Sequence, residues 1–155
     1  MAPQQFNLRT EWHVKAPIER VWAELSHPDD WPQWWQAVRR VEILSDGDAE
    51  GVGAERRMTW GTALPYVLTF NMRSARMEPM SVIEGRASGE LDGIGRWTLT
   101  PEGQGTHVRY DWQIELTKPW MRIFAPLLGP VFAWNHNVVM GWGYDGLCRR
   151  LGVEQ

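Results

Sequence analysis

Apolar and polar residues alternate along residues 6–14, which is the period of a β-strand with one face in water. Pro17 follows at a place that suits a first helical turn, and the apolar residues of segment 18–25 recur at i, i+3, i+4 and i+7. The sequence therefore predicts a strand followed by two short helices. The second helix is predicted from the same spacing at Trp31, Trp34, Trp35 and Val38.

Beyond Val38 the period returns to two residues as far as Leu116. Short alternating segments joined by turns rich in Gly, Pro and Asp are typical of an antiparallel meander. The segment 106–116 has the clearest alternation, with Tyr110 and Trp112 on its apolar phase. The strands predicted here cover residues 38–44, 54–60, 66–77, 81–88, 91–100 and 106–116.

The end of the chain is apolar with a helical period. The apolar stretch 119–131 is broken by Arg122, Pro126, Gly129 and Pro130, whereas residues 132–151 contain no proline, which predicts a helix from near Phe132 to near Leu151. One face of this helix carries Phe132, His136, Val139 or Met140, Gly143 and Leu147.

A sheet with one apolar face needs a cover, and the last helix is the only long element available. The order of elements predicts an α+β fold in which a curved antiparallel sheet of six to seven strands wraps around the C-terminal helix. We expect residues 1–155 to form a single domain.

The amino-acid composition disfavours several classes of function. Sixteen Lys and Arg against 19 Asp and Glu give a net charge of −3, with no basic block of the kind that binds nucleic acid. Cys148 is the only cysteine, so no internal disulfide forms. The sequence has neither the basic start and apolar run of a leader nor a long apolar stretch, which predicts a cytoplasmic protein without stable membrane insertion. The oligomeric state is open.

Tryptophan is unusually abundant, with 11 in 155 residues. Indole rings are too large to be buried completely in most cores. The domain therefore has either a very bulky core or indole surface facing a cavity, a ligand or a partner.

Several short motifs resemble the SRPBCC superfamily of START and birch-pollen-allergen-like helix-grip proteins. They are Val14-Lys15-Ala16-Pro17 with Val21-Trp22, His27-Pro28, and Trp31-Pro32-Gln33-Trp34. Later motifs, Glu78-Pro79, residues 106–112, and Asn135-His136 with Gly146-Leu147, are similar to its polyketide cyclase/dehydrase-like branch. The resemblance covers nearly the whole chain and implies a helix-grip fold with a cavity for apolar or aromatic molecules, in which only some members perform chemistry.

The sequence contains no phosphate-binding glycine loop, nucleophile elbow or zinc-protease motif. Asp46 begins a segment like a calcium loop, but Arg57 stands where a bidentate Glu is required. His13, His27, His107 and His136 are not at metal-ligand spacing. We therefore expect no metal, no cofactor and no assignable catalytic residue.

The candidate ligand-binding residues are apolar-phase aromatics and methionines with a few polar groups. They are Trp60, Phe70, Met72, Trp97, Tyr110, Trp112, Asn135, His136 and Met140. Each also fits a plain core position. Polar selectivity is expected from Asn135, His136 and Tyr110 rather than from the arginines.

Most of the strand arginines suit an outward, wet face, although one or two could enter the cavity to bind a carboxylate or enolate, with Glu84 as partner or acid/base group. These arginines are Arg56, Arg57, Arg73, Arg86 and Arg96. The stretch 119–134 is interpreted as a kinked helix start that closes one end of the sheet, with a mobile lid or a bilayer-touching surface as the alternative.

Three functions follow. The first is binding of a small apolar or aromatic, polyketide-like or lipid-like molecule between sheet and helix. The second is a polyketide cyclase or aromatase that uses the same cavity. The third is a filled core that acts through protein contacts.

Overall fold

The computed structural model describes residues 5–65, 67–89, 91–115, 119 and 123–155. The predicted strand ends at Tyr66 and Leu116, and Trp120 and Arg122 of the 119–134 stretch, lie outside these residues. The strands are β1 (Gln5–Val14), β2 (Val38–Ser45), β3 (Glu55–Gly61), β4 (Val67–Glu78), β5 (Val82–Gly89), β6 (Asp92–Glu102) and β7 (Gly105–Glu115). The helices are α1 (Ile18–Leu25), the 3-10 helix η1 (Pro28–Gln33) and α3 (Ala125–Leu151).

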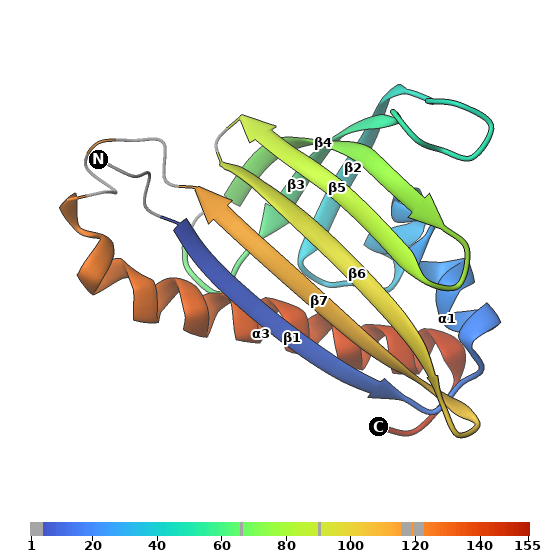
Figure 1. The fold of residues 1–155 in the computed structure, drawn as a ribbon. Coiled ribbons are helices and arrows are strands. Elements are labelled where there is room, and N and C mark those ends of the chain that lie inside the picture. The colour runs from blue at the N-terminus through green and yellow to red at the C-terminus, as the bar shows by residue number, and fades with distance from the viewer. Residues whose placement is uncertain (1–4, 66, 90, 116–118, 120–122) are drawn as a thin grey trace.

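The seven strands form one antiparallel sheet in the order β1-β7-β6-β5-β4-β3-β2 (Figure 1). Consecutive strands from β2 to β7 are neighbours, and β1 closes the order beside β7 with Phe6 opposite Ile114 and Trp12 opposite Val108. The predicted meander is confirmed.

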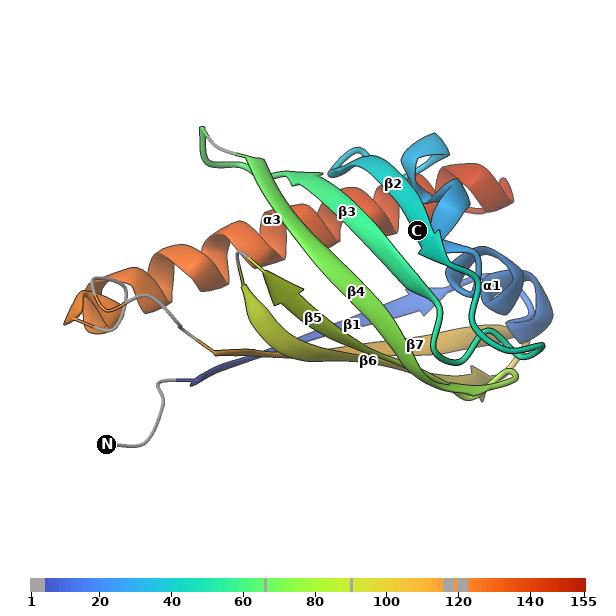
Figure 2. The ribbon, with the colours of Figure 1, turned by 90° about the horizontal axis from the view of Figure 1, so that it is seen from above.

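The sheet curves around α3, which runs along its concave side (Figure 2). Phe6 of β1 packs edge to face against Phe132 of α3, with ring centroids 5.6 Å apart. Further along the helix, the indole N–H of Trp35 donates a hydrogen bond of 2.9 Å to the carbonyl of Val139. The helix-grip architecture predicted from the sequence is therefore confirmed, with α1 and η1 at one end of the sheet.

The second predicted short helix is present, but it is a 3-10 helix and ends sooner than the spacing up to Val38 indicates. Residues 28–33 form a 3-10 helix with Pro32 inside it, and Val38 already begins β2. Because Pro32 lacks an N–H and disfavours an α-helical conformation at the residue before it, an α-helix cannot continue through this segment. The helical spacing instead places Trp31, Trp34 and Trp35 in the core.

Two glycines of α3 allow the segment directly after η1 to approach the helix closely. A Cβ at Gly146 would lie 1.8 Å from the carbonyl oxygen of Trp34, and a Cβ at Gly143 would lie 2.6 Å from the indole of Trp35. Because real Cβ atoms do not approach so closely, both positions require glycine for this packing.

The start of α3 also differs from the prediction, since the helix begins at Ala125 rather than near Phe132. Pro126 lies in the first turn, where its missing N–H costs nothing, but Pro130 lies inside the helix. An interior proline costs about 3 kcal/mol. Phe132 packs against Phe6, and Gly129 leaves room for the Phe6 ring, so the first turns of α3 lie against β1.

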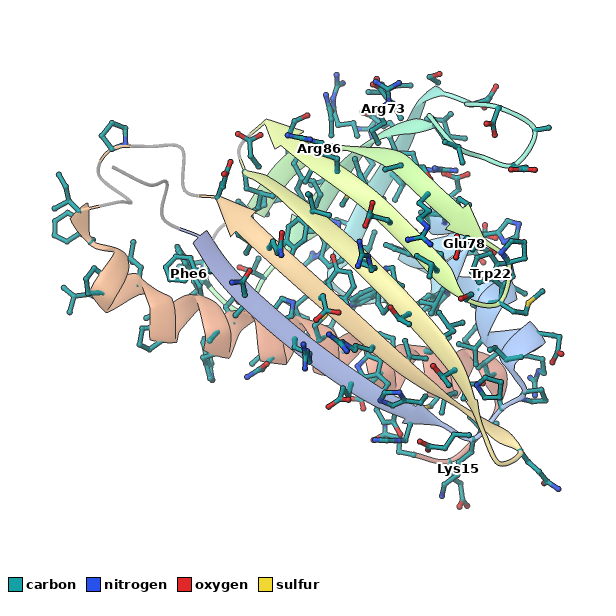
Figure 3. All side chains as sticks on the ribbon, viewed as in Figure 1. Phe6, Lys15, Trp22, Arg73, Glu78 and Arg86 are labelled. Atoms are coloured by element: carbon teal, nitrogen blue, oxygen red, sulfur yellow. The ribbon has the colours of Figure 1, made fainter. Side chains whose placement is uncertain are left out.

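The convex face of the sheet is polar. Arg73 and Arg86, which are cross-strand partners on β4 and β5, are exposed and point away from α3 (Figure 3). Arg109 donates to Asp111 at 2.8 Å on β7. This charged surface explains the alternation seen in the strands. Among the described residues, no helix is both long and apolar enough to cross a lipid bilayer.

Candidate functional site

A cavity of about 1090 Å³ lies between the concave face of the sheet and α3. Ligand sites of small molecules typically enclose about 300–1,000 Å³, so this space is larger than a packing defect. Its wall includes Leu8 of β1, Trp22 of α1, Ile83 of β5 and Leu128 of α3. The cavity therefore extends along most of the sheet.

All the candidate residues chosen from the sequence line this cavity, although their contact with a ligand stays a prediction. They are Trp60, Phe70, Met72, Trp97, Tyr110, Trp112, Asn135, His136 and Met140. Strand period was enough to identify the inward phase of β3, β4, β6 and β7. Leu128, Val131 and Phe132 at the start of α3 also line the cavity. Phe132 was already on the predicted inward face of the helix, whereas the prolines obscured the helical period of Leu128 and Val131.

Aromatic rings form one continuous wall. Trp97 and Tyr110 have centroids 4.3 Å apart, and Tyr110 stacks on Trp112 at 6.2 Å with an interplanar angle of 20°. Trp60 lies 6.2 Å from Phe70 and 4.9 Å from Trp35. A planar ligand would find ring faces and edges on this wall.

The tryptophans divide between core and cavity. Six of those in the described ranges are buried, and Trp31, Trp97 and Trp112 among them also line the cavity. Trp134 is 53% exposed on α3. The abundance of indole is therefore explained partly by a bulky core and partly by the cavity wall.

His136 and Tyr110 face each other across the cavity wall, with ring centroids 6.2 Å apart and an interplanar angle of 12°. Neither imidazole nitrogen has a hydrogen-bond partner, and both are buried. Burial lowers the pKa of His136 to about 4, because the charged imidazolium would lose its hydration. The imidazole is therefore neutral at neutral pH, with one nitrogen as donor and one as acceptor.

The Tyr110 hydroxyl lies over Gly95 of β6. A Cβ at residue 95 would be 2.5 Å from that hydroxyl oxygen, so glycine is needed to seat the phenol ring. Burial also raises the pKa of Tyr110 above its ordinary value. The phenol keeps its proton and remains a hydrogen-bond donor.

Asn135 has a structural role that the sequence did not indicate. Its side-chain oxygen accepts a hydrogen bond of 2.9 Å from the backbone N–H of Ala63, and the residue is 8% exposed. The contact ties the loop between β3 and β4 to the middle of the chain's last helix. The amide nitrogen of Asn135 remains as a donor at the cavity.

Among the strand arginines, Arg56 enters the cavity wall. Its Nε–H donates to Oδ1 of Asp29 at 2.7 Å. Arg57, Arg73, Arg86 and Arg96 are exposed. Glu84 borders the cavity, but its carboxylate pairs with Arg96 rather than with Arg56.

Among the described residues, no three His, Cys, Asp or Glu side chains lie close enough together to hold a metal ion. His13 and His107 lie on β1 and β7 and approach Glu102 and Glu11, at 2.9 Å and 3.1 Å. Cys148 is buried, and burial raises the pKa of its thiol, which disfavours the reactive thiolate.

Residues 5–151 match the model of the family described as polyketide cyclase/dehydrase and lipid transport. No curated protein matches the sequence. The family match spans both the sheet and the helix that enclose the cavity.

Solved structures with the same fold are distant in sequence. TTHA0849 from Thermus thermophilus is 18% identical, with 94% of this chain and 99% of that chain covered and a TM-score of 0.77. The Zhui aromatase/cyclase from Streptomyces sp. R1128 is 15% identical over 95% of this chain and 93% of that chain, also with a TM-score of 0.77. The di-domain ARO/CYC StfQ from the steffimycin biosynthetic pathway is 16% identical over 96% of this chain and 52% of that chain, with a TM-score of 0.71. At these identities the similarity establishes the fold.

Proposed function

The chain belongs to the polyketide cyclase/dehydrase and lipid transport family, and on that basis we propose that it binds a small apolar or aromatic molecule, polyketide-like or lipid-like, between sheet and helix. The observation that carries this proposal is the cavity of about 1090 Å³, bounded by a continuous aromatic wall. A core that acted only through protein contacts would have no need to leave this volume unfilled, since protein interiors pack closely.

The ligand contacts are assigned by chemistry. Trp60, Phe70, Trp97 and Trp112 offer apolar ring surface, while Met72 and Met140 adapt to an irregular outline. Three hydrogen-bonding groups on the wall are neutral: the Tyr110 hydroxyl, the His136 imidazole and the Asn135 amide. They suit carbonyl and hydroxyl groups on an otherwise apolar ligand.

A cyclase or aromatase activity is the second candidate, because the Zhui and StfQ proteins named above are aromatase/cyclases of the same fold. A general base works best with a pKa near the operating pH. The pKa of His136 is lowered to about 4, and both of its nitrogens lack a partner that would orient it. These properties favour binding over proton abstraction in the ligand-free protein.

Intrinsic tryptophan fluorescence tests the proposal, because Trp60, Trp97 and Trp112 line the cavity. The protein is titrated with a panel of aromatic polyketides, flavonoids and fatty acids, with free N-acetyltryptophanamide as the control for light absorption by the ligand. We expect saturable quenching or a spectral shift with at least one class, together with a raised melting temperature. No response to any class, in fluorescence or in melting temperature, would contradict the proposal.

A further inference from the structure

Arg56 is the only Lys or Arg that lines the cavity within the described part of the chain. It occupies the inward phase of β3, with Met58 and Trp60 at the next inward positions. Its side chain is 20% exposed, whereas that of the neighbouring outward Arg57 is 49% exposed. Because charged groups are costly to desolvate, a guanidinium in this position must gain favourable interactions that offset the cost.

Asp29 of η1 satisfies one edge of this guanidinium. Nε of Arg56 donates to Oδ1 at 2.7 Å and Nη2 donates to Oδ2 at 3.4 Å. Arginine carries five N–H donors in a planar fork. The edge formed by Nη1 and Nη2 can therefore still donate hydrogen bonds to a second anion that approaches it end-on. The hydrogen bonds that Arg56 makes to described residues use Nε and Nη2 and leave Nη1 aside.

The surroundings of Arg56 strengthen an interaction with an anion. Its cross-strand partners are Met72 on β4 and the exposed Ile43 on β2, and Met58 beside it is 2% exposed. Met58 and Met72 lower the polarity on one side of the guanidinium, which raises the energy of a charge-assisted hydrogen bond relative to water. The acidic residues nearest this end of the cavity, Asp46, Asp48 and Glu50, are exposed on the loop after β2 and are screened by solvent.

We propose that Arg56 binds an acidic group, such as a carboxylate, sulfonate or enolate, on the apolar ligand of the cavity. The inference rests on the proposed binding function and specifies the class of ligand. Arg56 precedes Trp60 by four residues on β3, about 13 Å along an extended strand, and Asn135 bonds to Ala63 beyond that. The ligand therefore has an elongated apolar body, an acidic end at Arg56 and neutral polar groups near Asn135 and His136.

Two fluorescent probes with the same aromatic body test this inference. N-phenyl-1-naphthylamine is neutral, and 8-anilinonaphthalene-1-sulfonate carries an added sulfonate. We expect the wild-type protein to bind the sulfonate about tenfold or more tightly than the amine, and Arg56→Met to lose that preference while it still binds the amine. Methionine suits the site because Met58 and Met72 already surround it.

Two further variants separate ligand binding from a structural role of the ion pair. Asp29→Asn removes the carboxylate that competes for the guanidinium, so the sulfonate should bind several-fold more tightly than in the wild type, with the amine unchanged. Arg57→Gln, on the outward phase of the same strand, is the matched control and should alter neither affinity. Thermal denaturation of each variant shows whether it is folded.

The outcomes are distinct. Amine binding without a preference for the sulfonate, or a preference that survives in Arg56→Met, overturns this inference and leaves the proposed function in place. Weaker sulfonate binding by Asp29→Asn also overturns it, because the ion pair would then be structural. If neither probe binds the wild-type protein, the proposed function fails and the inference falls with it.

Discussion

The imidazole of His136 lies nearly parallel to the phenol of Tyr110, with ring centroids 6.2 Å apart. The pair joins the middle of α3 to β7 across the cavity wall, and both groups are neutral at neutral pH because burial disfavours their charged forms. Both groups can hydrogen-bond without carrying a charge, and His136 has no partner in the protein. This position is therefore the best place in the cavity to test polar contacts with a ligand.

Stability should fall on acidification because of His136. The unfolded chain has the ordinary histidine pKa of 6.5, whereas burial lowers the folded value to about 4. Between these values the unfolded state binds a proton that the folded state excludes, so the free energy of unfolding decreases as pH falls. We expect His136 to account for a loss of about 2 kcal/mol between about pH 7 and pH 5. Urea denaturation of the wild type and of His136→Leu measures it, and an equal loss in both proteins would refute the assignment.

Tyr110→Phe should weaken a ligand with polar groups about tenfold, because an unmade buried hydrogen bond costs about 1–3 kcal/mol. A wholly apolar ligand should bind as it does to the wild type. Titration with the best ligand of the panel and with an apolar analogue gives both values. Tyr144→Phe is the control, since Tyr144 donates to the carbonyl of His13 away from the cavity. A tenfold loss for the apolar analogue as well would mean that the substitution disturbs packing.

Gly146→Ala should destabilise the fold by about 2–3 kcal/mol, because the added methyl would overlap the carbonyl of Trp34 and force the segment directly after η1 away from α3. Gly141→Ala is the matched control, because nothing lies within 4 Å of a Cβ there. On that exposed helical position alanine should stabilise by about 0.5–1 kcal/mol. Denaturant midpoints of the two variants should therefore move in opposite directions, and a shared direction would contradict the packing described here.

Asn135→Ala should free the loop between β3 and β4, since its side-chain oxygen is the acceptor for the Ala63 N–H. Hydrogen exchange at the Ala63 amide is expected to accelerate about tenfold, because this factor corresponds to the free energy of roughly one hydrogen bond. Asn137→Ala, on the exposed side of the same helix, should leave this exchange unchanged. Unaltered exchange in Asn135→Ala would show that the loop is held by other contacts.

The fold could be predicted from the sequence because the alternation of apolar and polar residues shows which residues face the core. Alternation placed Tyr110 and Trp112 inward on β7, and the need to cover one apolar face identified α3 as the central helix. It did not give the extent of η1 or the start of α3, because the helical spacing of Trp31, Trp34 and Trp35 indicated a longer helix and Pro130 indicated a later start. Tertiary packing against Trp34, Trp35 and Phe6 decides the backbone there, and such contacts leave no local period.

The cavity was less predictable than the fold. Period separates inward from outward residues, but it cannot distinguish a filled interior from an open one, because that depends on how side chains meet across the sheet. It also could not show that Asn135 holds Ala63 or that Arg56 alone among the strand arginines reaches the cavity. The inward phase shared by Arg56, Met58 and Trp60 was the one available signal for that arginine.

The most direct test of a ligand-binding cavity is the affinity of N-phenyl-1-naphthylamine for wild type, Leu68→Trp and Ile94→Trp. Leu68 lines the cavity, so tryptophan there fills part of it, whereas Ile94 is 38% exposed on the convex face of β6 and lies outside the lining. We predict saturable binding to the wild type and to Ile94→Trp, and an affinity for Leu68→Trp that is lower by about tenfold or more. No saturable binding to the wild type, or equal affinity in all three proteins while each remains folded, would contradict the account.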